Sequence, residues 1–118
     1  MGKRIHVIKK QEEYGDFEAF NWKQEEFFNL LSSLDCYLGG TDDYSYDRVE
    51  IFVPEYEIAI NYLKDIRDGK TEFENIDILQ VQEALDALNY GIDDVINYME
   101  KFYEERDRSS DYIMFVSW

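Results

Sequence analysis

Histidine, cysteine and proline each occur only once in this 118-residue sequence, as His6, Cys36 and Pro54. A single cysteine excludes an internal disulfide, and one histidine with one cysteine cannot supply the ligands of an ordinary zinc site. A histidine-based catalytic triad would have to be built on His6. The lack of disulfides favours a reducing compartment, so we expect a cytoplasmic location.

Long apolar runs and glycine-rich phosphate loops are missing as well. No stretch approaches the ~20 apolar residues that span a bilayer, and the run Ile5 to Ile8 is too short for a signal peptide. Gly39-Gly40 is followed by neither a lysine nor further glycines, so no nucleotide-binding loop is predicted. We therefore expect no membrane association and no cofactor.

Basic residues are scarce, because 12 Lys and Arg stand against 27 Asp and Glu, giving a net charge of -15. The first forty residues hold 5 basic and 7 acidic groups, so most of the excess lies after residue 40. A field of this sign repels nucleic acids and anionic membranes and attracts basic proteins and divalent cations. Direct nucleic-acid binding is not expected, and the charge favours a basic protein partner. The alternative is an acidic surface that serves solubility alone.

Apolar content, by contrast, is high: 45% of residues are hydrophobic and 17% aromatic. This composition is far from that of disordered chains, and the length is typical of one domain. The sequence shows no internal repeat and no linker between periodic segments. We therefore predict a single globular domain over residues 1–118.

The most apolar stretch is Asp111 to Trp118, which carries apolar side chains on both faces of a predicted strand. This pattern is typical of a central strand covered on both sides. Residues 11–18 are interpreted as a connection. Further strands are predicted at 4–8 and, at an edge, at 48–53, and apolar spacing predicts helices near 21–38, 54–67, 71 or 77 to 88, and 93–108. The predicted fold is α+β in the order β-α-β-α-α-α-β, a small sheet of about three strands covered by about four helices, with the C-terminal strand central.

The candidate binding site is the tyrosine-rich acidic loop that follows the first predicted helix, together with Tyr37 near the end of that helix. Its tyrosines have no core periodicity, and tyrosines among carboxylates are a common way to build a protein contact. The acidic groups would steer a basic partner towards the site. An alternative is that the tyrosines fold back on their own helix. The predicted site consists of Tyr37, Asp42, Asp43, Tyr44, Tyr46 and Asp47.

The other chemistry-bearing residues do not form a recognisable site. Asp42, Asp43 and Asp47 are hard oxygen ligands of the kind that Ca²⁺ or Mg²⁺ prefers, but their spacing is not that of an EF-hand loop. His6 lies in an apolar strand and is interpreted as structural. Cys36 follows Asp35, whose carboxylate would raise the thiol pKa, and is interpreted as a packing residue. We therefore predict no catalytic residue and no metal site.

Three functional interpretations follow. The favoured one is a small non-enzymatic protein-interaction module that binds a basic partner, of the inhibitor, immunity or DNA-mimic type. The second is a carboxylate-based enzyme, with or without a divalent cation such as Mg²⁺ or Ca²⁺, which needs a pocket; a pocket that holds several acids and His6 would favour it. The third is a structural subunit that forms a homodimer through the edge strand at 48–53.

Overall fold

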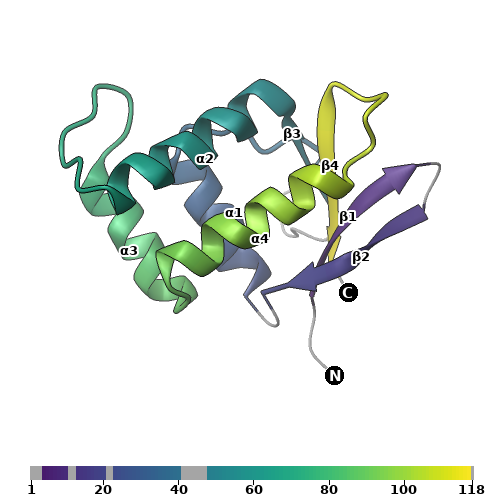
Figure 1. The fold of residues 1–118 in the computed structure, drawn as a ribbon, viewed down its shortest axis with the longest axis horizontal. Coiled ribbons are helices and arrows are strands. Elements are labelled where there is room, and N and C mark those ends of the chain that lie inside the picture. The colour runs from purple at the N-terminus through teal and green to yellow at the C-terminus, as the bar shows by residue number, and fades with distance from the viewer. Residues whose placement is uncertain (1–3, 11–12, 21–22, 41–47, 118) are drawn as a thin grey trace.

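The computed structural model describes residues 4–10, 13–20, 23–40 and 48–117, in which four helices lie to one side of a four-stranded antiparallel sheet (Figure 1). The α+β class is therefore confirmed. The strands are β1 (Ile5–Lys10), β2 (Glu13–Ala19), β3 (Arg48–Phe52) and β4 (Tyr112–Ser117). The helices are α1 (Gln24–Ser33), α2 (Val53–Arg67), α3 (Ile78–Leu88) and α4 (Ile92–Glu105).

The sheet has the strand order β2-β1-β4-β3, so β4 is central and β3 is an edge strand, as predicted. Both β1 and β3 pair with β4, which confirms the partners expected for the last strand. The interpretation of residues 11–18 as a connection was wrong, because β2 occupies most of this segment. Its charges and Gly15 hide the strand pattern, and β2 pairs only with β1, in a register that shifts twice. Such an edge strand needs little apolar content.

One face of β4 is buried against the helices, whereas the other is only partly covered. Ile113, Phe115 and Ser117 are buried, while Tyr112 is exposed and Met114 and Val116 are partly exposed. The expectation that helices cover both faces of this strand was therefore wrong. Apolar residues on the second face are tolerated because cross-strand neighbours shield them in part.

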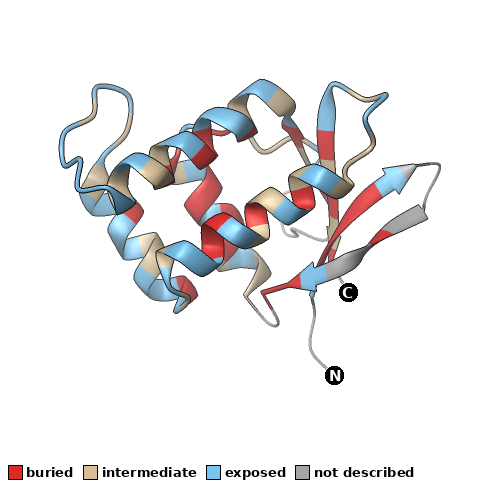
Figure 2. Ribbon diagram, in the orientation of Figure 1, coloured by how far each residue is buried: buried red, intermediate tan, exposed pale blue. Residues whose placement is uncertain are grey.

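The core lies between the sheet and the helices, where the buried residues gather (Figure 2). The Phe115 ring lies at its centre, 5.9 Å from the Phe27 and Phe28 centroids on α1 and 5.2 Å from that of Phe102 on α4. Tyr56 on α2 completes this cluster and donates a hydrogen bond from its hydroxyl to the Met99 carbonyl at 2.6 Å. Aromatic packing therefore joins three helices to the central strand.

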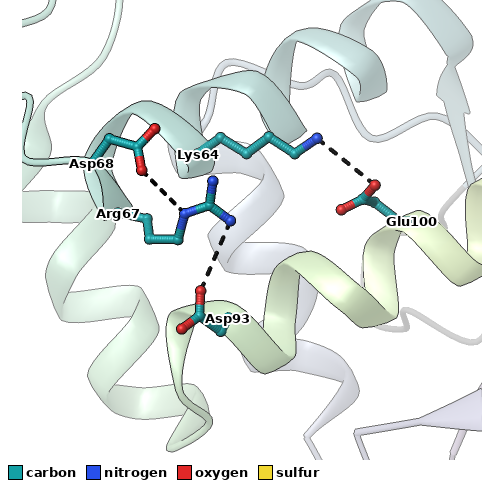
Figure 3. A network of polar contacts seen from close by, with 5 residues as sticks. All are labelled: Lys64, Arg67, Asp68, Asp93 and Glu100. Atoms are coloured by element: carbon teal, nitrogen blue, oxygen red, sulfur yellow. Dashed lines mark hydrogen bonds and ion pairs between the residues drawn. The ribbon is translucent and has the colours of Figure 1, made fainter.

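Ion pairs on the outer side join α2 to α4 (Figure 3). The Lys64 Nζ atom lies 3.7 Å from Glu100 Oε2. The Arg67 guanidinium lies between Asp68, at 3.3 Å, and Asp93, at 3.9 Å. Because these groups are well exposed, each pair contributes well under about 1 kcal/mol. As a consequence, the five charged groups in these pairs already have partners of opposite charge.

The helix boundaries settle what the sequence left open. Asp77 is the N-cap of α3, where its Oδ1 accepts a hydrogen bond from the Leu79 N–H at 3.0 Å, so the helix starts there and not at Thr71. Pro54 lies in the first turn of α2, as predicted. Helix α4 ends at Glu105, before the predicted Arg108, because the backbone turns extended at Arg106.

Helix α1 ends at Ser33, although apolar spacing had predicted a helix as far as Leu38. The chain leaves the helix because Asp35 adopts a left-handed conformation with φ of 67°. Residues 36–40 then run along the outer edge of β3, where Gly39 forms an isolated bridge with Glu50. This early helix end brings Tyr37 next to the sheet.

Candidate partner-binding hollow

A hollow of about 380 Å³ opens at the β3 edge of the sheet, where β3 passes into α2. Five large hydrophobic side chains are exposed among the described residues, and three of them line this hollow: Tyr37, Phe52 and Tyr112, at 78%, 40% and 46% exposure. The gathering of exposed aromatic groups at one place is typical of a contact surface. We call this site the aromatic–acidic hollow, and it is lined by Tyr37, Gly39, Glu50, Phe52, Glu55 and Tyr112.

Two backbone hydrogen bonds fix the wall that carries Tyr37. The Gly39 N–H donates to the Glu50 carbonyl at 2.9 Å, and the Glu50 N–H donates to the Gly39 carbonyl at 2.7 Å. A Cβ at Gly39 would lie 3.3 Å from that Glu50 oxygen, so glycine allows the two backbones to come this close. The segment that carries Tyr37 is therefore anchored to β3 at Gly39, two residues after Tyr37.

The opposite wall consists of two aromatic residues paired across β3 and β4. Phe52 and Tyr112 lie directly opposite each other in the register, and their ring centroids are 5.6 Å apart. The Val53 N–H donates to the Asp111 carbonyl at 2.9 Å, which continues the pairing past the end of β3. Both rings lie on the face of the sheet away from the helices.

Among the described residues, Glu50 and Glu55 supply the charge of the hollow, and none of the Lys and Arg side chains described there lines it. Glu55 lies in the first turn of α2, and its Oε1 accepts a hydrogen bond from the Tyr37 N–H at 2.9 Å. The Arg48 Nη2 atom lies 3.9 Å from Glu50 Oε1, and both side chains are exposed to solvent. The hollow therefore presents aromatic faces beside two carboxylates, an arrangement that attracts a cationic group.

Cys36 lies buried next to Tyr37, and its Sγ is 3.6 Å from the Glu55 carbonyl. Burial, followed by the negative charges of Glu55 and Asp35, raises the pKa of the Cys36 thiol to about 12. The thiol is therefore protonated at neutral pH and is a poor nucleophile, in line with its interpretation as a packing residue.

This protonation state predicts that Cys36 resists alkylation. At pH 8 we expect iodoacetamide to modify the folded protein at least about a hundredfold more slowly than the urea-unfolded protein, because a higher pKa leaves less thiolate at any given pH below it. Mass spectrometry of timed samples measures both rates. Equal rates in the two states would contradict the burial of this thiol.

A second hollow, of about 360 Å³, lies between α2 and α4 and differs in charge. It contains Lys64 and Arg108 as well as three glutamates. Its Tyr103 hydroxyl donates to Glu57 Oε2 at 2.6 Å, a hydrogen bond that raises the pKa of Tyr103. Because Lys64 also pairs with Glu100, the charged groups of this hollow largely satisfy one another. The aromatic–acidic hollow is therefore the better candidate site for a cationic partner.

The sequence-predicted site is only partly described. Tyr37 lies in the hollow and is highly exposed. The other five predicted residues, Asp42, Asp43, Tyr44, Tyr46 and Asp47, lie outside the described residues. Sequence reasoning missed Glu50, Phe52, Glu55 and Tyr112. One signal was present, since Phe52 follows Arg48 and Glu50 on the polar face of the β3 alternation, where a large aromatic residue is unexpected.

His6 lies on β1, opposite Val116, and lines neither hollow. It is buried, with its Nε2 atom 3.6 Å from Glu18 Oε2. Burial lowers the pKa of His6, against the opposing effect of Glu18. Both described hollows therefore lack a histidine.

Within the described ranges, no group of three or more His, Cys, Asp and Glu side chains is arranged to hold a metal ion. The aspartates considered as Ca²⁺ or Mg²⁺ ligands lie outside those ranges. None of the described helices has the length and apolar character needed to cross a membrane. In comparisons with known proteins, no protein-family model matches the chain, and no curated protein or solved structure resembles it significantly.

Proposed function

We propose that this chain is a non-enzymatic protein-interaction domain that binds a basic protein through the aromatic–acidic hollow. The observation that carries the proposal is the gathering of the exposed side chains of Tyr37, Phe52 and Tyr112 around one hollow. In the part of the chain that the structure describes, the charged side chains that line this hollow are both glutamates, Glu50 and Glu55. Aromatic groups dominate binding energy at protein interfaces, and carboxylates steer cationic partners. The chain's net charge of -15 extends this steering beyond the site.

Among the types of interaction protein, the contacts favour an inhibitor-like plug over a DNA mimic. A mimic needs rows of unpartnered carboxylates along a helix, and α4 carries Asp93 and Glu100 among its acidic residues. These two groups pair with Arg67 and Lys64 on α2 (Figure 3). A plug needs only one anchoring site surrounded by negative charge, which the hollow offers.

The two alternatives have less support. A pocket that combines acids with His6 would favour a carboxylate enzyme, and neither hollow described above includes His6. Homodimerisation through the β3 edge would need that edge to be free. Gly39 already pairs with Glu50 there, which occupies the middle of the strand.

The proposal predicts partner capture that depends on the hollow. Three immobilised proteins are incubated with cell lysate of their source: the wild type, the hollow variant Tyr37→Ala/Glu50→Gln and the control variant Leu79→Ala/Glu83→Gln. Mass spectrometry identifies the lysate proteins that each one retains. The control residues lie on α3, where Leu79 is the most exposed aliphatic residue described, and both variants have the same net charge. We expect the wild type and the control variant to retain a basic protein. The hollow variant should retain at least about tenfold less of the same protein.

In the same experiment, the salt concentration of the wash separates long-range electrostatic attraction of the partner from direct contact with the aromatic side chains. Washing at high salt should weaken retention by the wild type but not abolish it, because screening removes the long-range attraction and leaves the aromatic contacts. Equal retention by the hollow and control variants would contradict the assigned site. A retained partner that is acidic or uncharged would contradict the assigned partner class.

A further inference from the structure

We propose that the group which enters the aromatic–acidic hollow is an arginine side chain of the partner. This inference rests on the proposed function and names the chemistry that the site recognises. It starts from the form of the hollow, which offers flat aromatic faces and carboxylates from two different elements. Tyr37 and the Phe52–Tyr112 pair supply the faces, and Glu50 on β3 and Glu55 on α2 supply the acceptors.

The aromatic walls favour a planar cation. Both Arg and Lys are attracted to the face of an aromatic ring, but only the guanidinium is flat, weakly hydrated and able to stack. The chain itself contains a contact of this kind, since the Arg106 guanidinium carbon lies 3.8 Å from the Tyr103 ring centroid. Three aromatic side chains around one hollow therefore favour the planar cation.

The two carboxylates differ in what they already contact. Glu55 accepts the Tyr37 N–H through Oε1, which fixes its orientation, whereas Glu50 forms a long, exposed ion pair with Arg48 at 3.9 Å that an incoming cation can share. Two acceptors reaching the site from separate elements suit a donor with several N–H groups spread in one plane. A guanidinium has five such donors, while an ammonium is a compact point charge. The same two glutamates exclude an anionic side chain by repulsion.

The size of the hollow and the anchoring of its walls also suit an arginine side chain. A hollow of about 380 Å³ falls within the range of small-ligand pockets, so it admits a long side chain without rearrangement. Its rim is set by the Gly39–Glu50 hydrogen bonds and by the Phe52–Tyr112 pair, so the site exists before binding. A preformed site of this kind loses little entropy when the side chain enters.

The test titrates the full-length protein with three blocked tripeptides, acetyl-Gly-X-Gly-amide, in which X is arginine, lysine or citrulline. Citrulline has the shape of arginine without its charge. NMR chemical shifts of the Tyr37 and Tyr112 ring signals report binding. We expect the arginine peptide to bind with a Kd at least about tenfold lower than that of the citrulline peptide and about threefold or more lower than that of the lysine peptide.

Two single variants test whether the arginine peptide binds in the aromatic–acidic hollow. Glu50→Gln should weaken arginine-peptide binding at least about fivefold, whereas Glu83→Gln on α3 should leave it unchanged. Equal or tighter binding of the lysine or citrulline peptide, or no ring shift with the arginine peptide at 10 mM, would overturn the inference. If partner capture still depends on the hollow in that case, only the arginine assignment fails. If capture is also indifferent to the hollow, the proposed function fails as well.

Discussion

Phe115→Ala is expected to lower the free energy of unfolding by about 3–5 kcal/mol, which is a large share of the ~5–15 kcal/mol available to a domain of this size. Phe115 is fully buried on the central strand. Its ring contacts those of Phe27, Phe28, Tyr56 and Phe102. Removing it takes away the contact that joins α1, α2 and α4 to the sheet, and the surrounding rings cannot collapse fully into the cavity.

The adjacent residue on the same strand provides the control. Val116 points to the opposite face of β4 and is only partly buried. Val116→Ala should cost no more than about 1 kcal/mol, because little apolar area is removed from a site already near water. Urea unfolding, monitored by circular dichroism, measures the free energy of unfolding of both variants. Similar losses for the two variants would mean that both faces of β4 are covered alike, against the one-sided arrangement described here.

The second large effect is expected at Phe20, which combines core packing with an unusual backbone. Its ring is buried and stacks on Phe27 with a centroid distance of 4.5 Å, yet its φ is 59°. Phe20→Ala should cost about 3–5 kcal/mol through lost packing. Phe20→Gly should be no less stable than Phe20→Ala, because glycine adopts the left-handed conformation without the ~1 kcal/mol or more that a Cβ costs there.

Phe102 supplies the matched comparison, since it is equally buried but lies inside α4. There Phe102→Gly should be less stable than Phe102→Ala by about 1 kcal/mol, the usual cost of glycine within a helix. Urea titrations of the four variants give the two glycine–alanine differences. If the difference at Phe20 matched that at Phe102 in sign and size, the left-handed backbone at Phe20 would be refuted.

Much of the fold could be predicted because apolar periodicity and end signals agree along most of the chain. The central place of β4 was predicted from its apolar side chains on both faces, and Pro54 marked the start of α2. The predictions that were wrong failed for local reasons. Strand β2 is polar because only one neighbour pairs with it, so periodicity did not show it. The apolar stripe that continues past α1 to Leu38 concealed the left-handed turn at Asp35.

The candidate site was less predictable than the fold. Tyr37 was found because it lacks a helical packing position, but its neighbours in the hollow come from β3, α2 and β4. Tyr112 in particular was expected to be buried, because both faces of its strand were predicted to be covered. It is exposed because the helices cover only the other face. Proximity between residues that lie some 75 positions apart, as Tyr37 and Tyr112 do, depends on strand order, which a single sequence does not specify.

The central claim, that the hollow is where a basic partner binds, is tested most directly by site-specific photocrosslinking. A photoreactive phenylalanine analogue replaces Tyr37 in one protein and Leu79 in another, two positions exposed to 78% and 68%. Each protein is illuminated with cell lysate of its source. A crosslink from position 37 but not from position 79 to one basic protein, at an arginine-containing segment, is the predicted result. Crosslinks from position 79 to the same partner, with none from position 37, would contradict the account.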